Sequence, residues 1–216
     1  SSIQAFTRSS KSPRYFAPES KAVKSSENEI ISMQQTKYKV HDGTDRQNDK
    51  EVSFTVTCFA TNKGMAILGA GLNHSDGKPL HTTVEQCVMV PGITHELAND
   101  SHLLRNGNVY YRSLDNQNII IEENTINGNW IRNNTAYNRP ATLDVLKAYI
   151  PITNGTYAYS IQTPSTKDMT FIVASNTEDV QAVVVPNENK IIAAFYNNDS
   201  FSYGGNTYTG NKGDIK

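Results

Sequence analysis

The feature that most constrains the fold is an alternation of apolar and polar residues with a period of two in the segment Glu51–Ala60. Val52, Phe54 and Val56 alternate there with Ser and Thr, which is the pattern of a half-buried β-strand. We expect these apolar side chains to form the core together with those of the next apolar run and one later strand. The predicted core residues are Val52, Phe54, Val56, Ile67, Leu68 and Val84.

Similar short β segments follow along the chain, with turn residues between them. The apolar run Met65–Leu72 contains Gly69 and Gly71, which favour a bulge or a close backbone approach over a helix. Leu143–Ala148 alone has a spacing that also fits a helical turn. Short strands separated by frequent turn signals predict an all-β fold of stacked antiparallel sheets. Further strands are expected at 80–90, 108–113, 118–122, 129–132, 142–152, 158–162, 170–175, 181–186 and 191–196.

The periodic pattern is uneven along the chain and suggests a division into parts. Residues 1–45 are rich in Ser, Lys and Pro and predict an irregular lead-in, although Glu29–Tyr38 fits either a short strand or an irregular path. Residues 46–166 are predicted to form a central β-sandwich domain, and 167–216 a small C-terminal β domain. The chain starts without Met or a signal-peptide pattern, so we expect a mature product or a fragment.

Charge and cysteine content exclude several classes of protein. The 20 Lys and Arg residues balance 21 Asp and Glu residues, which argues against a nucleic-acid partner. No apolar stretch approaches the ~20 residues that span a bilayer, so we expect no membrane partner. Cys58 and Cys87 are too few for a disulfide scaffold or a tetrahedral zinc site, while one bridge and two separate thiols both stay open. We expect neither a metal nor a cofactor.

No motif of an autonomous enzyme is present: the sequence lacks G-x-S-x-G, H-E-x-x-H, a P-loop and Cys-x-x-Cys. Four of the five histidines fall in predicted loops, where a solvated side chain is the simpler interpretation, and His81 begins a strand. Glu85 lies within the β-forming segment Thr82–Cys87, and alternation places it on the face opposite Val84. There it is a solvated carboxylate, a partner for a sugar hydroxyl, or a group that orients an arginine of another domain.

Aromatic residues provide the remaining candidates for sugar contacts. Trp130 is either a core residue or a surface on which a sugar ring stacks. Tyr110, Tyr111, Tyr157 and Tyr159 are further stacking candidates, and their spacing divides them between a core face and an outer face.

Several segments in the same order resemble the β domains of polysaccharide lyase family 8, which includes hyaluronate, chondroitin AC and xanthan lyases. Gly64–Leu72 followed by Thr82–Gln86 resembles a glycine-containing strand and the Thr-Thr-Val-Glu strand that follows it in the family. Two positions depart from the family pattern, since Arg105 and Asn154 stand where the family has histidine. The other matching segments are 106–111, 128–133, 154–159 with Pro164, and 173–182.

The resemblance implies a galactose-mutarotase-like β-supersandwich followed by a small C-terminal β-sandwich. It implies a secreted or periplasmic lyase that removes the C5 proton of a uronic acid in an acidic polysaccharide and eliminates the 4-linked sugar. In the family, the residues that transfer the proton lie on an N-terminal α/α-toroid domain. This chain has no helical pattern to build such a domain, so we expect it to be inactive alone.

The resemblance also assigns roles to particular residues. Glu85 resembles the family glutamate that reaches from the β domain toward the catalytic groups and orients them, an auxiliary catalytic role. Two rival interpretations stay open: a stand-alone carbohydrate-binding or adhesion module, and a structural β domain of a larger surface protein. The expected carbohydrate-binding residues are His81, Asn106, Tyr110, Tyr111 and Trp130.

Overall fold

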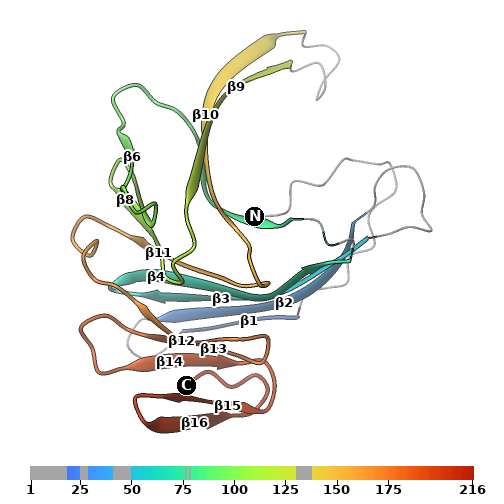
Figure 1. Ribbon diagram of the computed structural model, residues 1–216, viewed down its shortest axis with the longest axis vertical. Helices are drawn as coiled ribbons and strands as arrows, with labels where there is room; N and C mark the ends of the chain where they lie inside the picture. The colour runs from blue at the N-terminus through green and yellow to red at the C-terminus, as the bar shows by residue number, and fades with distance from the viewer. Residues whose placement is uncertain (1–18, 25–28, 41–49, 76, 78, 130–137) are drawn as a thin grey trace.

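The computed structural model describes residues 19–24, 29–40, 50–75, 77, 79–129 and 138–216 (Figure 1). These residues form strands β1 to β16 and contain no helix, so none of them belongs to a helix able to cross a membrane. The strands make four sheets of eight, three, three and two strands, in which the paired strands are antiparallel. The all-β prediction is confirmed.

The eight-stranded sheet, called the main sheet below, has the order β1-β2-β3-β4-β11-β8-β7-β6. The long neighbours β2, β3 and β4 are hairpin-connected, and β11 then joins this group to the short strands β8, β7 and β6. Its strands are β1 (Glu19–Lys24), β2 (Ile30–Val40), β3 (Lys50–Thr61), β4 (Gly64–His74), β6 (His95–Leu97), β7 (Leu103–Asn106), β8 (Val109–Ser113) and β11 (Tyr157–Gln162).

The three smaller sheets lie on the two sides of the main sheet. In Figure 1, β9 and β10 rise from one side, β12 to β14 run along the other side, and β15 and β16 lie beyond them. The first small sheet contains β5 (His81–Val88), β10 (Pro140–Pro151) and β9 (Ile120–Asn129). The others contain β12 (Ile172–Asn176), β13 (Val180–Val184) and β14 (Ile191–Phe195), then β15 (Asp199–Tyr203) and β16 (Asn206–Gly210).

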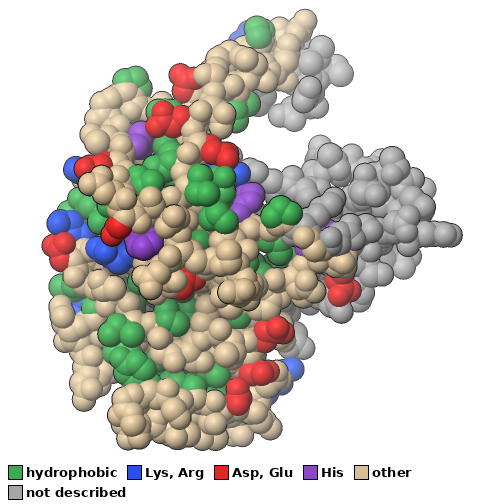
Figure 2. Space-filling view, in the orientation of Figure 1, with side chains coloured by type: hydrophobic (Ala, Val, Ile, Leu, Met, Phe, Trp, Pro, Cys, Tyr) green, Lys and Arg blue, Asp and Glu red, His purple; other side chains and the backbone are tan. Residues whose placement is uncertain are grey.

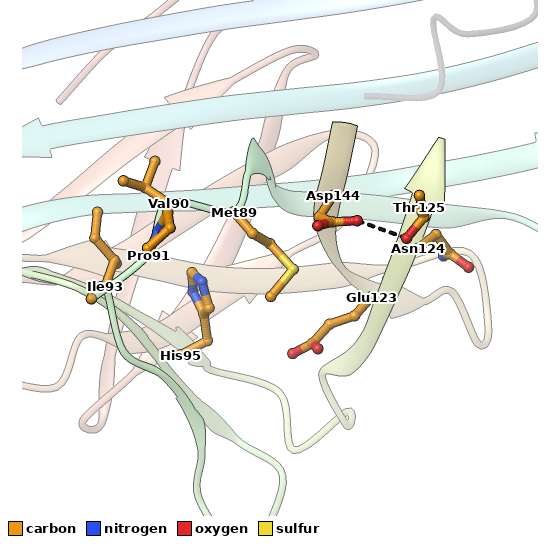
Figure 3. A pocket seen from close by; sticks show the side chains of 10 residues that line it. Met89, Val90, Pro91, Ile93, His95, Glu123, Asn124, Thr125 and Asp144 are labelled. Atoms are coloured by element: carbon orange, nitrogen blue, oxygen red, sulfur yellow. Dashed lines mark hydrogen bonds between the residues drawn. The ribbon is translucent and has the colours of Figure 1, made fainter. Parts of the chain in front are cut away.

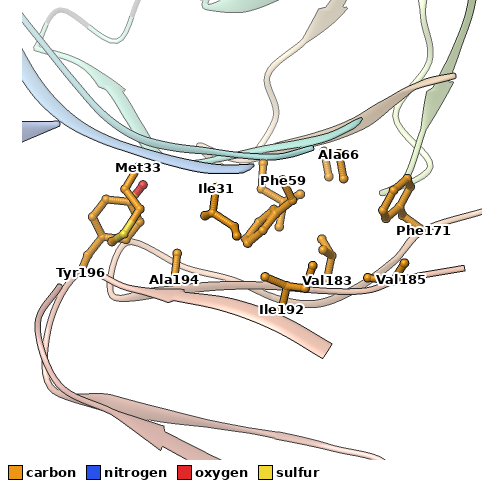
Figure 4. Packing of buried hydrophobic residues seen from close by; sticks show 12 residues of the cluster. Ile31, Met33, Phe59, Ala66, Phe171, Val183, Val185, Ile192, Ala194 and Tyr196 are labelled. Carbon is orange, nitrogen blue, oxygen red and sulfur yellow. The ribbon is translucent and has the colours of Figure 1, made fainter. Parts of the chain in front are cut away.

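Three apolar clusters hold these layers together. The first fills the space between the main sheet and the β12–β13–β14 sheet, with Phe59 and Phe171 among its fully buried members (Figure 4). The second covers the opposite face of the main sheet and includes Leu104, Tyr111 and Ile150. A third joins the β12–β13–β14 sheet to β15 and β16. The main sheet is therefore covered by protein on both faces, which explains why few of its strands alternate cleanly between buried and exposed positions.

Strand β3 shows this double coverage most clearly. Its polar residues Thr55 and Thr57 are buried in line with Phe59, while Val56 packs against the second cluster. The Thr57 hydroxyl donates to Gln181 Oε1 at 2.5 Å, which satisfies a polar group in a buried position. The alternation therefore predicted the strand correctly, but its polar side faces another protein layer and not solvent.

The predicted core residues are distributed over both faces. Val52, Leu68 and Val84 are buried, as expected. Phe54, Val56 and Ile67 are only half-buried, although Val56 and Ile67 do pack against the second cluster. Phe59, which the prediction omitted, is fully buried.

One local prediction is wrong. The lead-in is not irregular throughout, because residues 19–24 form β1 and residues 30–40 form β2, which is the strand alternative for Glu29–Tyr38. Strand β2 has few apolar residues, but its full length pairs with β3, and this ladder compensates for the weak sequence pattern. Leu143–Ala148 lies in β10, so the strand expected at 142–152 is confirmed over the helical-turn alternative. Strand β10 is hydrogen-bonded to β5 on one side and β9 on the other. The domain boundaries at 45/46 and 166/167 stay predictions.

Glycine and cysteine positions bear on two further expectations. A Cβ atom on Gly69 would collide with the ring of Tyr157, and Gly71 has a φ of +64°, so the two glycines do mark a close approach and an unusual backbone. Cys58 and Cys87 are both free thiols, and burial raises the pKa of Cys58.

Candidate functional site

A β-bulge in β5 determines where Glu85 points. In the pairing with β10, Glu85 lies opposite Ala148 and Thr83 lies opposite Tyr149, so Val84 is an extra residue in β5. A bulge of this kind interrupts the strict alternation of side chains. Val84 packs in the second apolar cluster with Tyr111, and the Glu85 carboxylate contacts the same tyrosine. The predicted placement of Glu85 on the face opposite Val84 is therefore wrong.

The Glu85 carboxylate is held by three donors, and its side chain is half-buried. Its Oε2 accepts from the Tyr111 hydroxyl at 2.5 Å and from Asn106 Nδ2 at 3.1 Å. Its Oε1 accepts from the backbone N–H of Gln86 at 2.7 Å. A carboxylate has about four lone-pair sites, so one site on Oε1 is left for an additional donor.

Asn106 lies at the end of β7, where the chain turns into β8. Gly107 begins this two-residue turn with a φ of +57°, a conformation that glycine adopts without strain. The turn brings Asn106 over β5, where its Nδ2 also lies 3.4 Å from Cys87 Sγ. Asn106 therefore contacts two residues of β5 that are two positions apart on one face.

Tyr111 is buried between β7 and β11, next to the Glu85 carboxylate. Burial, followed by the hydrogen bond to Glu85, raises the pKa of the phenol well above its usual value. The hydroxyl therefore keeps its proton over the physiological range and remains a donor. The group Glu85, Asn106 and Tyr111, called the Glu85 cluster below, is thus an oriented acceptor held by neutral donors.

A hollow of about 560 Å³ lies between the segment that follows β5 and strands β9 and β10 (Figure 3). His95 lines it and lies directly opposite Asn106 in the β6–β7 pairing. One wall is apolar and the other is polar, and Thr125 donates to Asp144 across two strands of the polar wall at 2.6 Å. The apolar wall consists of Met89, Val90, Pro91 and Ile93, and the polar wall of Glu123, Asn124, Thr125 and Asp144.

The sequence contained no signal for this hollow. Its polar wall comes from β9 and β10, which are more than ten residues apart in the chain and meet only through sheet pairing. The Nδ1 atom of His95 is buried without a hydrogen-bond partner among the described residues. The same residues contain no group of three His, Cys, Asp or Glu placed to hold a metal ion.

His81 does not join the Glu85 cluster. It begins β5 on the outer face of the small sheet, with its ring centre 4.8 Å from that of Tyr149. Tyr149 in turn donates to Glu122 at 2.9 Å, and Lys147 Nζ lies 4.6 Å from the Tyr149 ring centre. Partial burial and the nearby Lys147 lower the pKa of His81. His81 therefore belongs to a separate surface group.

Tyr110 is also separate, because it projects from the face of β8 opposite to Tyr111. It lies beside Arg105 and Lys167. Trp130 falls outside the described residues. Of the predicted site residues, the structure therefore brings together Glu85, Asn106 and Tyr111.

A main sheet covered on both faces by smaller antiparallel sheets defines the class of β super-sandwich proteins. The family model described as "Polysaccharide lyase family 8, super-sandwich domain" matches residues 22–171, and the chain belongs to this family. A search of curated protein sequences finds no match.

Solved structures of similar architecture come from much longer lyases. A chondroitinase AC lyase has a TM-score of 0.68 and 21% identity, with 91% of this chain and 31% of that chain covered. A Paenibacillus xanthan lyase has a TM-score of 0.67 and 14% identity, with 91% of this chain and 21% of that chain covered. The Streptomyces coelicolor A3 chondroitin AC lyase has a TM-score of 0.61 and 18% identity, with 87% of this chain and 25% of that chain covered. This chain therefore spans less than a third of each of these lyases and shares their fold over that part.

Proposed function

We propose that this chain is the β-domain portion of a polysaccharide lyase that degrades uronic-acid-containing glycans, of the hyaluronan, chondroitin or xanthan type, by β-elimination. In this proposal the chain supports one side of the substrate cleft, and an α/α-toroid domain or chain supplies the groups that transfer the proton. A polymeric acidic substrate also implies a secreted or periplasmic protein. Membership of the lyase family and the names of the structurally similar lyases support the proposal.

The observation that carries the proposal is the set of partners that the Glu85 carboxylate has within the chain. Its partners are neutral donors, and neither Arg105 nor Arg112 pairs with it. Within the described part of the chain no cation pairs with this half-buried carboxylate, which is therefore open to a charge-assisted hydrogen bond from the guanidinium of another domain. Because both sites of Oε2 are occupied, the additional donor binds through Oε1 alone. In this proposal that donor is a catalytic group, and the contact orients it.

The proposal is tested by Glu85→Gln in an enzyme that carries both this β domain and a toroid domain. We expect kcat to fall by about tenfold or more and KM to stay within about twofold, because the carboxylate acts on catalytic groups and not on ground-state binding. Product formation is followed by the ultraviolet absorbance of the unsaturated uronate. The matched control is Glu178→Gln, which removes an exposed carboxylate at the β12–β13 turn.

Thermal unfolding of the same variants separates this role from a structural one. Glu85 has partners within the chain, so Glu85→Gln is expected to cost about 1 kcal/mol of folding free energy. An unchanged kcat, or a loss of kcat explained by unfolding at the assay temperature, would falsify the orienting role.

A second prediction concerns the isolated 216-residue chain. It is expected to release no unsaturated product from hyaluronan, chondroitin or xanthan, because the Glu85 cluster offers an oriented acceptor without the proton-transfer groups of a toroid. A complete xanthan lyase and a complete chondroitin AC lyase serve as positive controls in the same absorbance assay. Product formed by the purified chain alone would show that the toroid is dispensable.

A further inference from the structure

A second polar surface lies around Tyr110, on the face of β8 opposite to the Glu85 cluster. Arg105 pairs with Tyr110 across the β7–β8 hairpin, and its Cζ lies 6.0 Å from the centre of the tyrosine ring. Lys167, from the loop after β11, places its Nζ at the same distance of 6.0 Å. A phenol ring attracts cations electrostatically at about this distance. Tyr110 thus helps to keep two cations from separate segments on one surface.

A third cation, Arg112, lies two residues after Tyr110 on the same face of β8. Its Nη2 donates to the backbone carbonyl of Lys167 at 3.3 Å, which ties the loop to the strand. Figure 2 shows Lys and Arg side chains on the left of the molecule, at the level of β8 and β11 in Figure 1. The β7–β8 hairpin and the loop that contains Lys167 therefore converge here, although the loop lies more than 50 residues later in the chain.

The acidic neighbours neutralise only part of this surface. Asp168 forms an exposed ion pair with Lys167 at 3.2 Å, and Glu96 lies opposite Arg105 in the β6–β7 pairing. Within the described part of the chain, neither Arg105 nor Arg112 forms an ion pair with a carboxylate. The surface around Tyr110 therefore carries three cations, Arg105, Arg112 and Lys167, against the two carboxylates of Asp168 and Glu96.

Arg105 also keeps most of its donors. A guanidinium has five N–H donors, and the described chain uses only Nε of Arg105, which donates to the Gly107 carbonyl at 3.0 Å. That bond fixes the side chain and leaves the two terminal nitrogens as a planar fork. Such a fork matches two oxygens of one oxyanion.

We propose that Arg105, Tyr110, Arg112 and Lys167, called the Tyr110 platform, bind a carboxylate or sulfate group of an acidic glycan outside the cleft. The proposal takes its ligand class from the proposed function. The platform and the Glu85 cluster occupy opposite faces of the same sheet, so one sugar unit cannot contact both. The platform holds the polymer and takes no part in the elimination. A second contact along one glycan raises its overall affinity through effective concentration.

The test is a calorimetric titration of the full 216-residue chain at fixed ionic strength. The probes are size-defined oligosaccharides of hyaluronan, which carries carboxylates alone, and of chondroitin sulfate, which also carries sulfate; a neutral dextran oligosaccharide is the reference. Arg105→Gln and Lys167→Gln each remove one platform cation. The control Lys212→Gln removes an exposed cation after β16.

Both platform variants are expected to weaken binding of at least one acidic probe about tenfold, the effect of one charge-assisted hydrogen bond. Lys212→Gln should change the affinity less than twofold, and dextran should not bind. The probe that loses more affinity identifies the carboxylate or the sulfate as the group bound.

Two results would overturn the platform: no binding of either acidic probe, or an equal loss of affinity in Lys212→Gln. The second result would show that the loss depends on net charge alone. Neither result affects the proposed function, whose test is the kcat of a complete enzyme.

Discussion

Replacing Phe59 by alanine is expected to lower the free energy of unfolding by about 3–5 kcal/mol. Phe59 is fully buried between β3 and the β12–β13–β14 sheet, in contact with a cluster that includes Ile31, Val183 and Ile192 (Figure 4). The strands on both sides are held by their ladders, so the surrounding layers close little of the cavity that the ring leaves. Urea unfolding followed by circular dichroism measures the loss.

The matched control is Phe54→Ala in the same strand. Phe54 is half-buried, so the same chemical change should cost about half as much, roughly 1.5–2.5 kcal/mol. Equal costs at the two positions would contradict the burial that the structure assigns to this strand.

Alkaline pH should destabilise the protein through its buried tyrosines. Burial raises the pKa of Tyr157 and of Tyr196 to about 12, whereas an unfolded tyrosine titrates near ~10. Between these values the unfolded state has lost the proton and the native state has kept it, so stability falls as pH rises. The contribution is complete below about pH 10 and is lost as pH rises toward 12, by about 1.4 kcal/mol per pH unit for each tyrosine.

The two tyrosines together should therefore remove about 5 kcal/mol over this range, and the raised pKa values of Tyr111 and Tyr159 act in the same direction. Urea midpoints at pH 9, 10, 11 and 12 report the slope. Tyr196→Phe is the control, and it should reduce the slope by about 1.4 kcal/mol per pH unit. A flat profile up to pH 12 would show that these hydroxyls titrate as in the unfolded chain.

The candidate site could be predicted only in part. The sequence selected Glu85, Asn106 and Tyr111 as site residues, and the structure brings these three together. It also selected His81 and Tyr110, which lie on other surfaces. The separation of Tyr110 from Tyr111 follows from alternation along one strand. The direction of Glu85 follows from a bulge, and the sequence of β5 alone contains no signal for an extra residue.

The sequence by itself determined the all-β class, the positions of most strands and the family. These features depend on local alternation, turn residues and short motifs, which act within one strand and its turns. Only the tertiary structure decided which layer each face of β3 contacts, that residues 30–40 form a strand of the main sheet, and that Arg105, Arg112 and Lys167 meet at Tyr110. Alternation along a strand distinguishes its two faces but does not identify what covers either of them. The hydrogen-bond partners of a strand and the layer on its second face come from pairing and packing between distant segments, so the local pattern could not predict them.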